Sequence, residues 1–255
     1  MNRIQREREF HDKLARKLMG GISLRRLTNR MAAGLDWEFL YKSIWAEVGD
    51  LHGKMVLDYG CGAGGLAIQL AKRGATAFGI DISENMLKLA VNLLKSGSQE
   101  DYCLLFSLQD CHRTAFQDQF FDYVFGFAIL HHLELEITYA ELARILKPGG
   151  KAFFIEPLLG HPLLSFWRKI TPSIRTFDEK PLNLREIEHA SRYFEVSHTE
   201  YFLLTPLAAP LSLIHPKLAK PLARILHNID MICFKYLPWT SRYAWITVIC
   251  LRLPT

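Results

Sequence analysis

The sequence of 255 residues has no apolar run long enough to cross a lipid bilayer. Its longest candidate, residues 201–214, is shorter than the roughly 18–20 residues that a membrane-spanning helix needs, and it contains Pro206 and Pro210. The first ten residues have no apolar core, so we expect no secretory signal. Both absences favour a cytoplasmic protein over a secreted or membrane-embedded one.

Cysteines are few, and their spacing suggests neither a disulfide nor a metal site. The five cysteines include no C-x-x-C pair and are odd in number. This pattern argues against a disulfide framework and against a zinc site, and it favours a reducing cytosol. We therefore predict no bound metal. The share of charged residues, 22%, is ordinary for a globular α/β domain of this length.

The net charge of +5 is unevenly distributed. Basic residues are in excess in residues 1–30 and again in 201–244, where Asp230 is the single acid. A basic arm can contact nucleic acid or an anionic membrane, but it is more often a solvated helix face. Since no RNA-binding module is recognisable, we expect no nucleic-acid partner. Peripheral membrane contact ranks below binding of a small molecule, and nothing in the sequence indicates an oligomeric state.

Residues 56–65, Val-Leu-Asp-Tyr-Gly-Cys-Gly-Ala-Gly-Gly, carry the strongest functional signal. A short apolar run ends in Asp58 and breaks into glycines. Gly60, Gly62 and Gly65 fit the G-x-G-x-x-G spacing. This order is typical of a strand, a tight turn and a helix, where missing Cβ atoms let a ligand approach the backbone and the helix N-terminus. A glycine-rich turn without a ligand is the alternative.

Apolar runs and amphipathic periods alternate along the chain, which predicts a parallel sheet with helices on both faces. The expected strands are residues 54–58, 76–81, 102–107, 121–127, 151–156, 193–199 and 245–251. The expected helices are residues 37–48, 64–73, 84–95, 134–146 and 184–192, and residues 1–30 also look helical. Ser83 is the expected N-cap of the helix that follows it.

The segments around the last strands are less regular. The Lys-Pro-Gly-Gly turn at 147–150 is expected to end the preceding helix. Residues 157–182 carry four prolines and are expected to form a long loop. Residues 200–244 are too many for a hairpin, so we expect an inserted helical element whose most periodic part is 222–237.

Four segments have the order and spacing of a known family. They are Val56-Leu-Asp-Tyr-Gly-Cys-Gly-Ala-Gly64, Gly79-Ile-Asp-Ile-Ser83, Phe121-Asp-Tyr-Val124 running into Leu130-His-His-Leu133, and Leu146-Lys-Pro-Gly-Gly150. With them the sequence resembles the class I S-adenosylmethionine-dependent methyltransferases, in particular the group that includes the ubiquinone and menaquinone biosynthesis methyltransferases. The resemblance covers about residues 50–160.

The resemblance implies a Rossmann-like, doubly wound α/β sheet of seven strands whose last strand is antiparallel. It implies an N-terminal helical cap over residues 1–50 and a methyltransferase domain over 51–255. Within that domain, residues 157–182 and 200–244 lie where the family varies most and would cover the acceptor site. The second of these segments would lie between strands 6 and 7.

The resemblance also implies S-adenosylmethionine as cofactor. In open α/β sheets a ligand lies outside the carboxyl ends of the strands. Asp58 would accept a hydrogen bond from the amino acid part, Asp81 would bind both ribose hydroxyls, and Asp110 would face the adenine amino group. The full set of expected cofactor-binding residues is Asp58, Gly60, Cys61, Gly62, Asp81, Ile82, Met86, Asp110, Cys111, Phe127 and Ala128.

Methyl transfer is an in-line displacement, so the protein must align the acceptor and, where needed, remove a proton. His131 and His132 follow one central strand, and Glu156 ends the next. We expect His131 to be the base, with His132 turned inward to pack and Glu156 orienting the histidine. The alternative is that neither histidine takes part and proximity alone suffices. His161 is a weaker candidate.

Large apolar residues are frequent in the segments expected to cover the acceptor. They predict a hydrophobic small molecule, natural-product or quinone-like, that is methylated at O, N or C. Two alternatives stay open. One is a NAD-dependent oxidoreductase. The other is a protein that binds the donor without methyl transfer, or uses it for another reaction such as a cyclisation.

Overall fold

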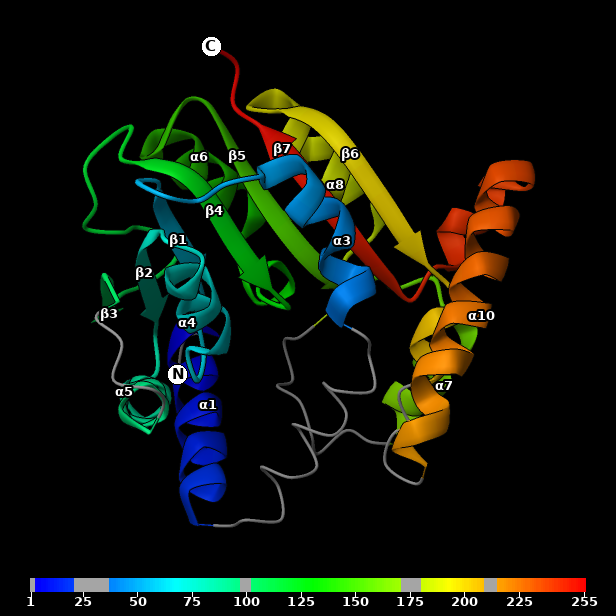
Figure 1. Cartoon of the computed structure of the whole chain (residues 1–255), viewed down its shortest axis with the longest axis horizontal. Coiled ribbons are helices and arrows are strands. Elements are labelled where there is room, and N and C mark those ends of the chain that lie inside the picture. The colour runs from blue at the N-terminus through cyan, green and yellow to red at the C-terminus, as the bar shows by residue number, and fades with distance from the viewer. Residues whose placement is uncertain (1–2, 21–36, 97–101, 171–179, 209–214) are drawn as a thin grey trace.

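The alternation of apolar runs and amphipathic periods forms a sheet with helices around it (Figure 1). The computed structural model describes residues 3–20, 37–96, 102–170, 180–208 and 215–255. Its strands are β1 (Met55–Tyr59), β2 (Thr76–Asp81), β3 (Leu104–Leu108), β4 (Phe121–Phe127), β5 (Leu146–Pro157), β6 (Glu195–Phe202) and β7 (Ile246–Arg252). Its α-helices are α1 (Arg3–Gly20), α3 (Trp37–Val48), α4 (Gly65–Lys72), α5 (Glu84–Lys95), α6 (Leu135–Ile145), α7 (Pro162–Ile170), α8 (Leu184–Glu188) and α10 (Pro216–Tyr236). Short 3-10 turns are η1 (Leu130–His132), η3 (His189–Arg192), η4 (Thr205–Ala208) and η5 (Pro238–Tyr243).

The seven strands form one sheet in the order β3-β2-β1-β4-β5-β7-β6. Strands β1 to β5 pair in parallel, whereas β7 runs antiparallel to both β5 and β6. This arrangement confirms the predicted fold class, including the antiparallel last strand and the helical insertion between β6 and β7. The parallel strands end at one edge of the sheet, where the turns that carry the sequence motifs meet.

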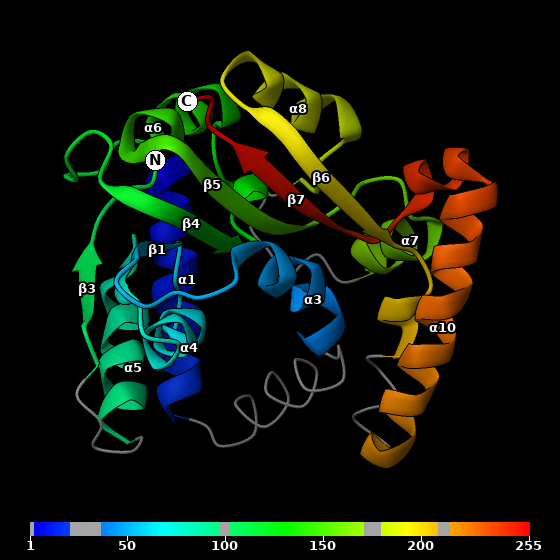
Figure 2. The same cartoon turned by 45° about the horizontal axis from the view of Figure 1, so that its top comes forward.

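Two apolar clusters fill the two faces of the sheet, with α3 and α4 in one and α6 and α8 in the other (Figures 1 and 2). The first contains Tyr41, Ile44, Leu70, Phe125 and Phe153, and the second contains Tyr139, Leu142, Phe121, Phe154 and Ile187. Residues of β5 alternate between the two clusters, because successive side chains of a strand point to opposite faces. A strand buried on both faces reads as a continuous apolar run, as expected for residues 152–155.

The turn predicted at residues 147–150 does not precede the strand but belongs to it. Strand β5 already begins at Leu146, which pairs with Phe121, and the register shifts before Lys151 pairs with Tyr123. The Pro-Gly-Gly residues therefore form a bulge in β5 rather than a loop. Gly149 has φ +74°, a conformation that glycine adopts without strain.

The prediction of a loop over residues 157–182 was wrong for its middle part. Residues 162–170 form α7, which begins with Pro162 at its first position. Proline is well tolerated there because the first N–H of a helix has no partner within the helix. Residues 171–179 lie outside the described residues.

The two N-terminal helices have different surroundings. Helix α3 packs on the sheet through Tyr41 and Ile44, whereas α1 packs on α5 and lies beside the carboxyl ends of β1 and β2 (Figure 2). Of the helical stretch predicted over 1–30, residues 21–30 lie outside the described residues. Within the described ranges, no helix is long and apolar enough to cross a bilayer.

Candidate functional site

A cavity of about 490 Å³ lies at the carboxyl ends of β1, β2, β3 and β4, with α1 along one side. The turns that follow these strands supply most of its wall. Its lining consists of Arg3, Ile4, Glu7, His11, Leu14, Leu18, Gly60, Gly62, Ala63, Asp81, Ile82, Met86, Asp110, Cys111, His112, Phe127, Ala128, Ile129, His132 and Leu133. This is the edge at which open α/β sheets bind ligands.

The glycine turn after β1 exposes bare backbone to the cavity. Gly60 and Gly62 have φ +75° and +50°, values that side chains rarely allow. A Cβ atom on Gly60 would lie 2.5 Å from the side chain of Ile129, so packing alone requires this glycine. A Cβ atom on Gly62 would meet no protein atom within 4 Å. Gly62 therefore leaves open space into which a ligand can approach the chain.

Asp81, at the end of β2, joins two turns of the cavity wall. Its Oδ2 accepts a hydrogen bond from the Gly62 N–H at 2.9 Å, and its Oδ1 accepts one from the Ser83 N–H at 2.8 Å. Burial raises the pKa of Asp81, while these hydrogen bonds and nearby His11 act in the opposite direction. Because a carboxylate has about four acceptor sites, Asp81 retains sites for a ligand in the cavity.

Asp58 lies behind the glycine turn and does not line the cavity. Its side chain is buried, and its Oδ2 accepts a hydrogen bond from the Ala67 N–H at 2.9 Å, in the first turn of α4. Burial raises the pKa of Asp58 to about 7, against the effect of this hydrogen bond, and the negative charge of Asp81 raises it further. A carboxylate so poorly compensated favours a cation nearby.

Asp110 and His112 form a fixed pair in the turn after β3. The Oδ1 of Asp110 accepts from the His112 N–H at 2.9 Å and lies 2.7 Å from the His112 Nδ1. The Glu134 N–H donates to the His112 Nε2 at 2.9 Å, so the ring proton of neutral His112 is on Nδ1. These contacts with His112 lower the pKa of Asp110 despite its partial burial. Burial raises the pKa of the adjacent Cys111 thiol, which is therefore a wall residue rather than a nucleophile.

Glu156, at the end of β5, holds the turn that follows β4. Its side chain is fully buried, and Oε1 accepts hydrogen bonds from the N–H groups of Ile129 and Leu130, both at 2.8 Å. Oε2 lies 2.7 Å from the Nδ1 of His131. His131 is thereby turned toward the protein interior and does not line the cavity. The backbone of Ala128, with φ +53°, begins this turn in a conformation that costs a non-glycine residue energy.

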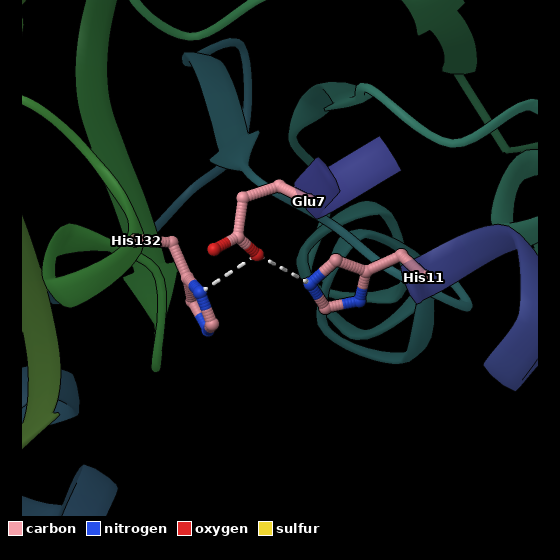
Figure 3. A group of neighbouring side chains, drawn as sticks. All are labelled: Glu7, His11 and His132. Atoms are coloured by element: carbon pink, nitrogen blue, oxygen red, sulfur yellow. Dashed lines mark ion pairs between the residues drawn. The ribbon is translucent and has the colours of Figure 1, made fainter. Parts of the chain in front are cut away.

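His132 points in the other direction, into a group with two residues of α1 (Figure 3). Its Nδ1 lies 3.1 Å from Oε2 of Glu7, and the same oxygen lies 3.7 Å from Nε2 of His11. The ligand atoms of the three residues lie within 4.8 Å of one another, a spacing that a single metal ion could bridge.

Asp12 joins helix α1 to the N-terminus of α5, beside the cavity. Its Oδ1 accepts from the Ser83 hydroxyl at 2.5 Å and from the Asn85 N–H at 3.2 Å, at the N-terminus of α5. Ser83 in turn caps α5 by accepting from the Met86 N–H at 3.1 Å, as predicted. The hydrogen bonds from Ser83 and Asn85 lower the pKa of Asp12, although partial burial acts against them. An anion at this helix end is favoured by the unpaired N–H groups.

The structure brings most of the predicted site residues together, and it leaves four outside the cavity lining. The lining contains Gly60, Gly62, Asp81, Ile82, Met86, Asp110, Cys111, Phe127, Ala128 and His132. Asp58, Cys61, His131 and Glu156 lie behind it. The orientations of the two histidines are thus the reverse of those expected, because His132 faces the cavity and His131 turns inward. His161 is buried beside Trp245, with ring centres 4.9 Å apart, and is not part of the lining.

The sequence interpretation missed the contribution of α1. Arg3, Glu7 and His11 recur every four residues and so share one face of the helix with Leu14 and Leu18, which also line the cavity. The spacing of these residues along one face of α1 was therefore visible in the sequence. What it could not reveal is the surface on which this face packs, because that depends on contacts with α5, far away in the sequence.

Comparison with known proteins relates the motif region to methyltransferases. Residues 57–154 match the family model described as a methyltransferase domain. The ubiquinone biosynthesis O-methyltransferase of Thiobacillus denitrificans is 44% identical over 106 residues, which cover 41% of this chain and 44% of that protein. The match therefore spans less than half the length of this curated relative.

Solved structures share the fold over a longer range. Phosphoethanolamine N-methyltransferase 2 of Haemonchus contortus, in complex with phosphomonomethylethanolamine and S-adenosylhomocysteine, has a TM-score of 0.60 at 22% identity, over 80% of this chain and 49% of that one. The cyclase SpnF has a TM-score of 0.59 at 20% identity, over 86% of this chain and 82% of that one. At these identities the likeness shows the fold alone.

The raised pKa of Asp58 predicts a pH-dependent effect of Asp58→Asn. The carboxyl group binds its proton more tightly in the folded than in the unfolded state, so its contribution to stability falls as the pH rises toward and through about 7. An asparagine oxygen can still accept from the Ala67 N–H. We expect Asp58→Asn to raise the free energy of unfolding by about 2 kcal/mol more at pH 8 than at pH 5. Denaturant unfolding at the two pH values measures this difference, and an equal effect at both would refute the buried-acid interpretation.

Proposed function

We propose that this chain, whose residues 57–154 carry a methyltransferase domain, binds S-adenosylmethionine in the cavity and transfers its methyl group to an O, N or C atom of a hydrophobic small molecule. The observation that supports this most is the convergence of Gly62, Asp81 and Asp110 on one cavity at the carboxyl ends of the strands. All three come from the matched region, although they are separated along the chain.

The residues present fit the donor's three parts. Asp81 is a half-buried acid that lines the cavity and retains acceptor sites, as the ribose hydroxyls require. The open face at Gly62, with Asp58 behind it, suits the charged amino acid part. Asp110 is held ionised by His112 at the far end, where it would accept from the adenine amino group, with Met86 lining the cavity between.

The acceptor would lie toward α1 and the turn after β4, where the wall is largely apolar. The apolar side chains there are Ile4, Leu14, Leu18, Ile129 and Leu133. The donor supplies a methyl group on a positively charged sulfur that is already a good leaving group. The tasks left to this chain are alignment, exclusion of water and, for an acidic acceptor, removal of a proton.

We assign the base role to His132 rather than to His131. His132 lines the cavity and has Glu7 at 3.1 Å to hold its ring and to stabilise its protonated form. His131 and Glu156 act through the backbone of the same turn and are positioning residues. The compact group after β4 thus combines one histidine that supports the turn with one that faces the ligand.

The sequence leaves two alternative functions open. The first, a nicotinamide-dependent oxidoreductase, is not supported by the strand order and direction of the sheet. Dinucleotide-binding folds have a sixth parallel strand beside β5, whereas this sheet places an antiparallel β7 there. The second alternative, donor binding with a different reaction or with none, shares the same cavity. Release of S-adenosylhomocysteine during incubation with candidate acceptors distinguishes it from methyl transfer.

Asp81→Asn tests the assignment of the donor site. We expect the wild-type protein to bind S-adenosylmethionine and S-adenosylhomocysteine but not NADH, and the variant to bind both at least about tenfold more weakly, since a ligand donor loses a charged acceptor. Titration calorimetry measures both affinities. Asp122→Asn is a matched control, because Asp122 accepts from the Met55 N–H at the opposite end of the sheet. Equal affinities in the Asp81 variant and the wild type would contradict the assignment.

Gly62→Ala tests the approach of the donor to the backbone. A methyl group at this position would occupy the open side of the cavity, so we expect loss of donor affinity by about tenfold or more, with about 1 kcal/mol of backbone strain. Gly49→Ala carries the same kind of strain, with φ +66° and no atom within 4 Å, but lies away from the cavity. Similar melting temperatures with affinity lost in the Gly62 variant alone would support the proposal. Unchanged affinity of that variant would exclude a ligand at this turn.

His132→Gln tests the base. With the acceptor found by screening, we expect turnover to fall about a hundredfold or more while the affinity for S-adenosylhomocysteine stays within a few-fold. Glu7→Gln should give a smaller loss of turnover, because the ring remains but its orientation and charge partner weaken. His52→Gln, at an exposed histidine, serves as control. If His131→Gln reduced turnover and His132→Gln did not, the base role would return to His131.

A further inference from the structure

Helix α10 presents an apolar stripe to solvent. Six of its large apolar side chains are between 39% and 68% exposed; Met231 lies elsewhere around the helix, and the other five are Leu218, Ile225, Ile229, Ile232 and Tyr236. Their spacing of seven, four, three and four residues places them along one face of the helix. Single exposed apolar residues are common on protein surfaces, but an aligned series along most of a 21-residue helix is not. We call these five residues the outer stripe.

A row of cations accompanies the outer stripe. Lys217, Arg224 and Lys235 each directly precede a residue of the stripe and so lie about 100° around the helix from it. Lys220 continues the same row. All four are exposed, and none forms an ion pair with a carboxylate among the residues that the structure describes. The single acid of α10 is Asp230, which is fully buried.

A second face, on the other side of the outer stripe from the cationic row, fixes α10 to the protein. Ala219 and Ala223 are 1% exposed, which allows close packing of the helix. The carboxylate of Asp230 accepts hydrogen bonds from the N–H groups of Leu203, Leu204 and Thr205 at 2.8–3.1 Å, at the end of β6 and the start of η4. The orientation of the outer stripe is therefore set by a buried, fully partnered anchor. The apolar face is directed outward by the fold.

We propose that α10 docks this protein on the surface of an anionic lipid bilayer. The outer stripe enters the boundary between headgroups and acyl chains, while the cationic row contacts the lipid phosphates. A helix with one apolar face and a flanking row of Lys and Arg has the physical character of an interfacial helix. At about 1.5 Å per residue the helix is roughly 30 Å long, and it lies along the surface because it is not apolar enough to cross it.

Charge favours a bilayer over a second copy of the chain. If two copies packed antiparallel through their outer stripes, the cationic rows of both helices would be brought side by side, and the single acid of α10, the buried Asp230, would not neutralise them. Like charges at such an interface cost several kcal/mol. An anionic membrane instead attracts each basic residue near its surface. This inference concerns a surface at the β6 end of the sheet, away from the cavity beside α1, and it does not depend on the proposed function (Figure 1).

Co-sedimentation with vesicles tests the proposal. We expect the full chain to sediment with vesicles of mixed phosphatidylglycerol and phosphatidylcholine, and far less with phosphatidylcholine alone. Raised salt should weaken the binding, since it screens the cationic row. Arg224→Gln combined with Lys220→Gln should weaken it about tenfold or more.

A pair of matched variants separates the outer stripe from a general effect of added charge. Ile232→Glu places an acid within the stripe and should reduce vesicle binding by about tenfold or more. Leu105→Glu places the same acid on β3, at the other end of the sheet, where Leu105 is 60% exposed, and should not reduce it. Both sites are exposed, so both variants are expected to fold, as circular dichroism would verify.

Three outcomes would overturn the proposal. One is equal binding to anionic and neutral vesicles. The second is full binding by the Ile232 variant. The third is a wild-type dimer in sedimentation equilibrium that Ile232→Glu converts to a monomer, without vesicle binding by either protein, which would assign the stripe to a second copy of the chain.

Discussion

The architecture of the site depends on one constraint, namely that the turns after parallel strands leave backbone N–H groups without partners inside the protein. Buried or half-buried carboxylates supply those partners. Asp58 binds the start of α4, Asp81 binds the turns after β1 and β2, and Glu156 binds the turn after β4. An unpaired buried N–H costs free energy comparable to a lost hydrogen bond, so each acid fixes the turn it contacts. The same acids bring negative charge to the edge of the sheet where a cationic ligand is proposed to bind.

One part of the cavity wall is formed by the turns at the edge of the sheet, and another part is formed by α1. The side that we propose for the donor is built from turns whose geometry the carboxylates hold. Helix α1 is joined to it through Asp12, which binds the first turn of α5, and so brings Glu7 next to His132. A helix outside the region matched by the family model thereby completes a site whose other residues come from that region. Under the proposed function, variation in α1 would alter the acceptor side without disturbing the turns of the sheet.

The sequence alone predicted those structural features that depend on residues close together in the chain. Ser83 caps α5 as expected, and the glycine turn and Asp81 occupy their predicted places because the strand, the turn and the helix are contiguous in the chain. It did not predict features that depend on contacts with residues far away in the chain. His131 and His132 are adjacent, and only the contact with Glu156, 25 residues away, determines which one turns inward. The bulge in β5 was mistaken for a turn for the same reason: its pairing with β4 lies outside any local pattern.

Glu7 has a second role in the proposed reaction, which follows from the charges that the reaction creates and removes. In the proposed reaction, methyl transfer removes the positive charge of the sulfonium, and a proton taken up by His132 creates a new one a short distance away. Glu7, 6% exposed, holds its carboxylate 3.1 Å from His132, where it can stabilise that second charge in surroundings of low polarity. A cavity with Glu7 in place therefore contains a counter-charge before and after the transfer. Because α1 supplies this carboxylate and also lines the cavity, alignment of the proposed base and closure of the cavity depend on the same helix.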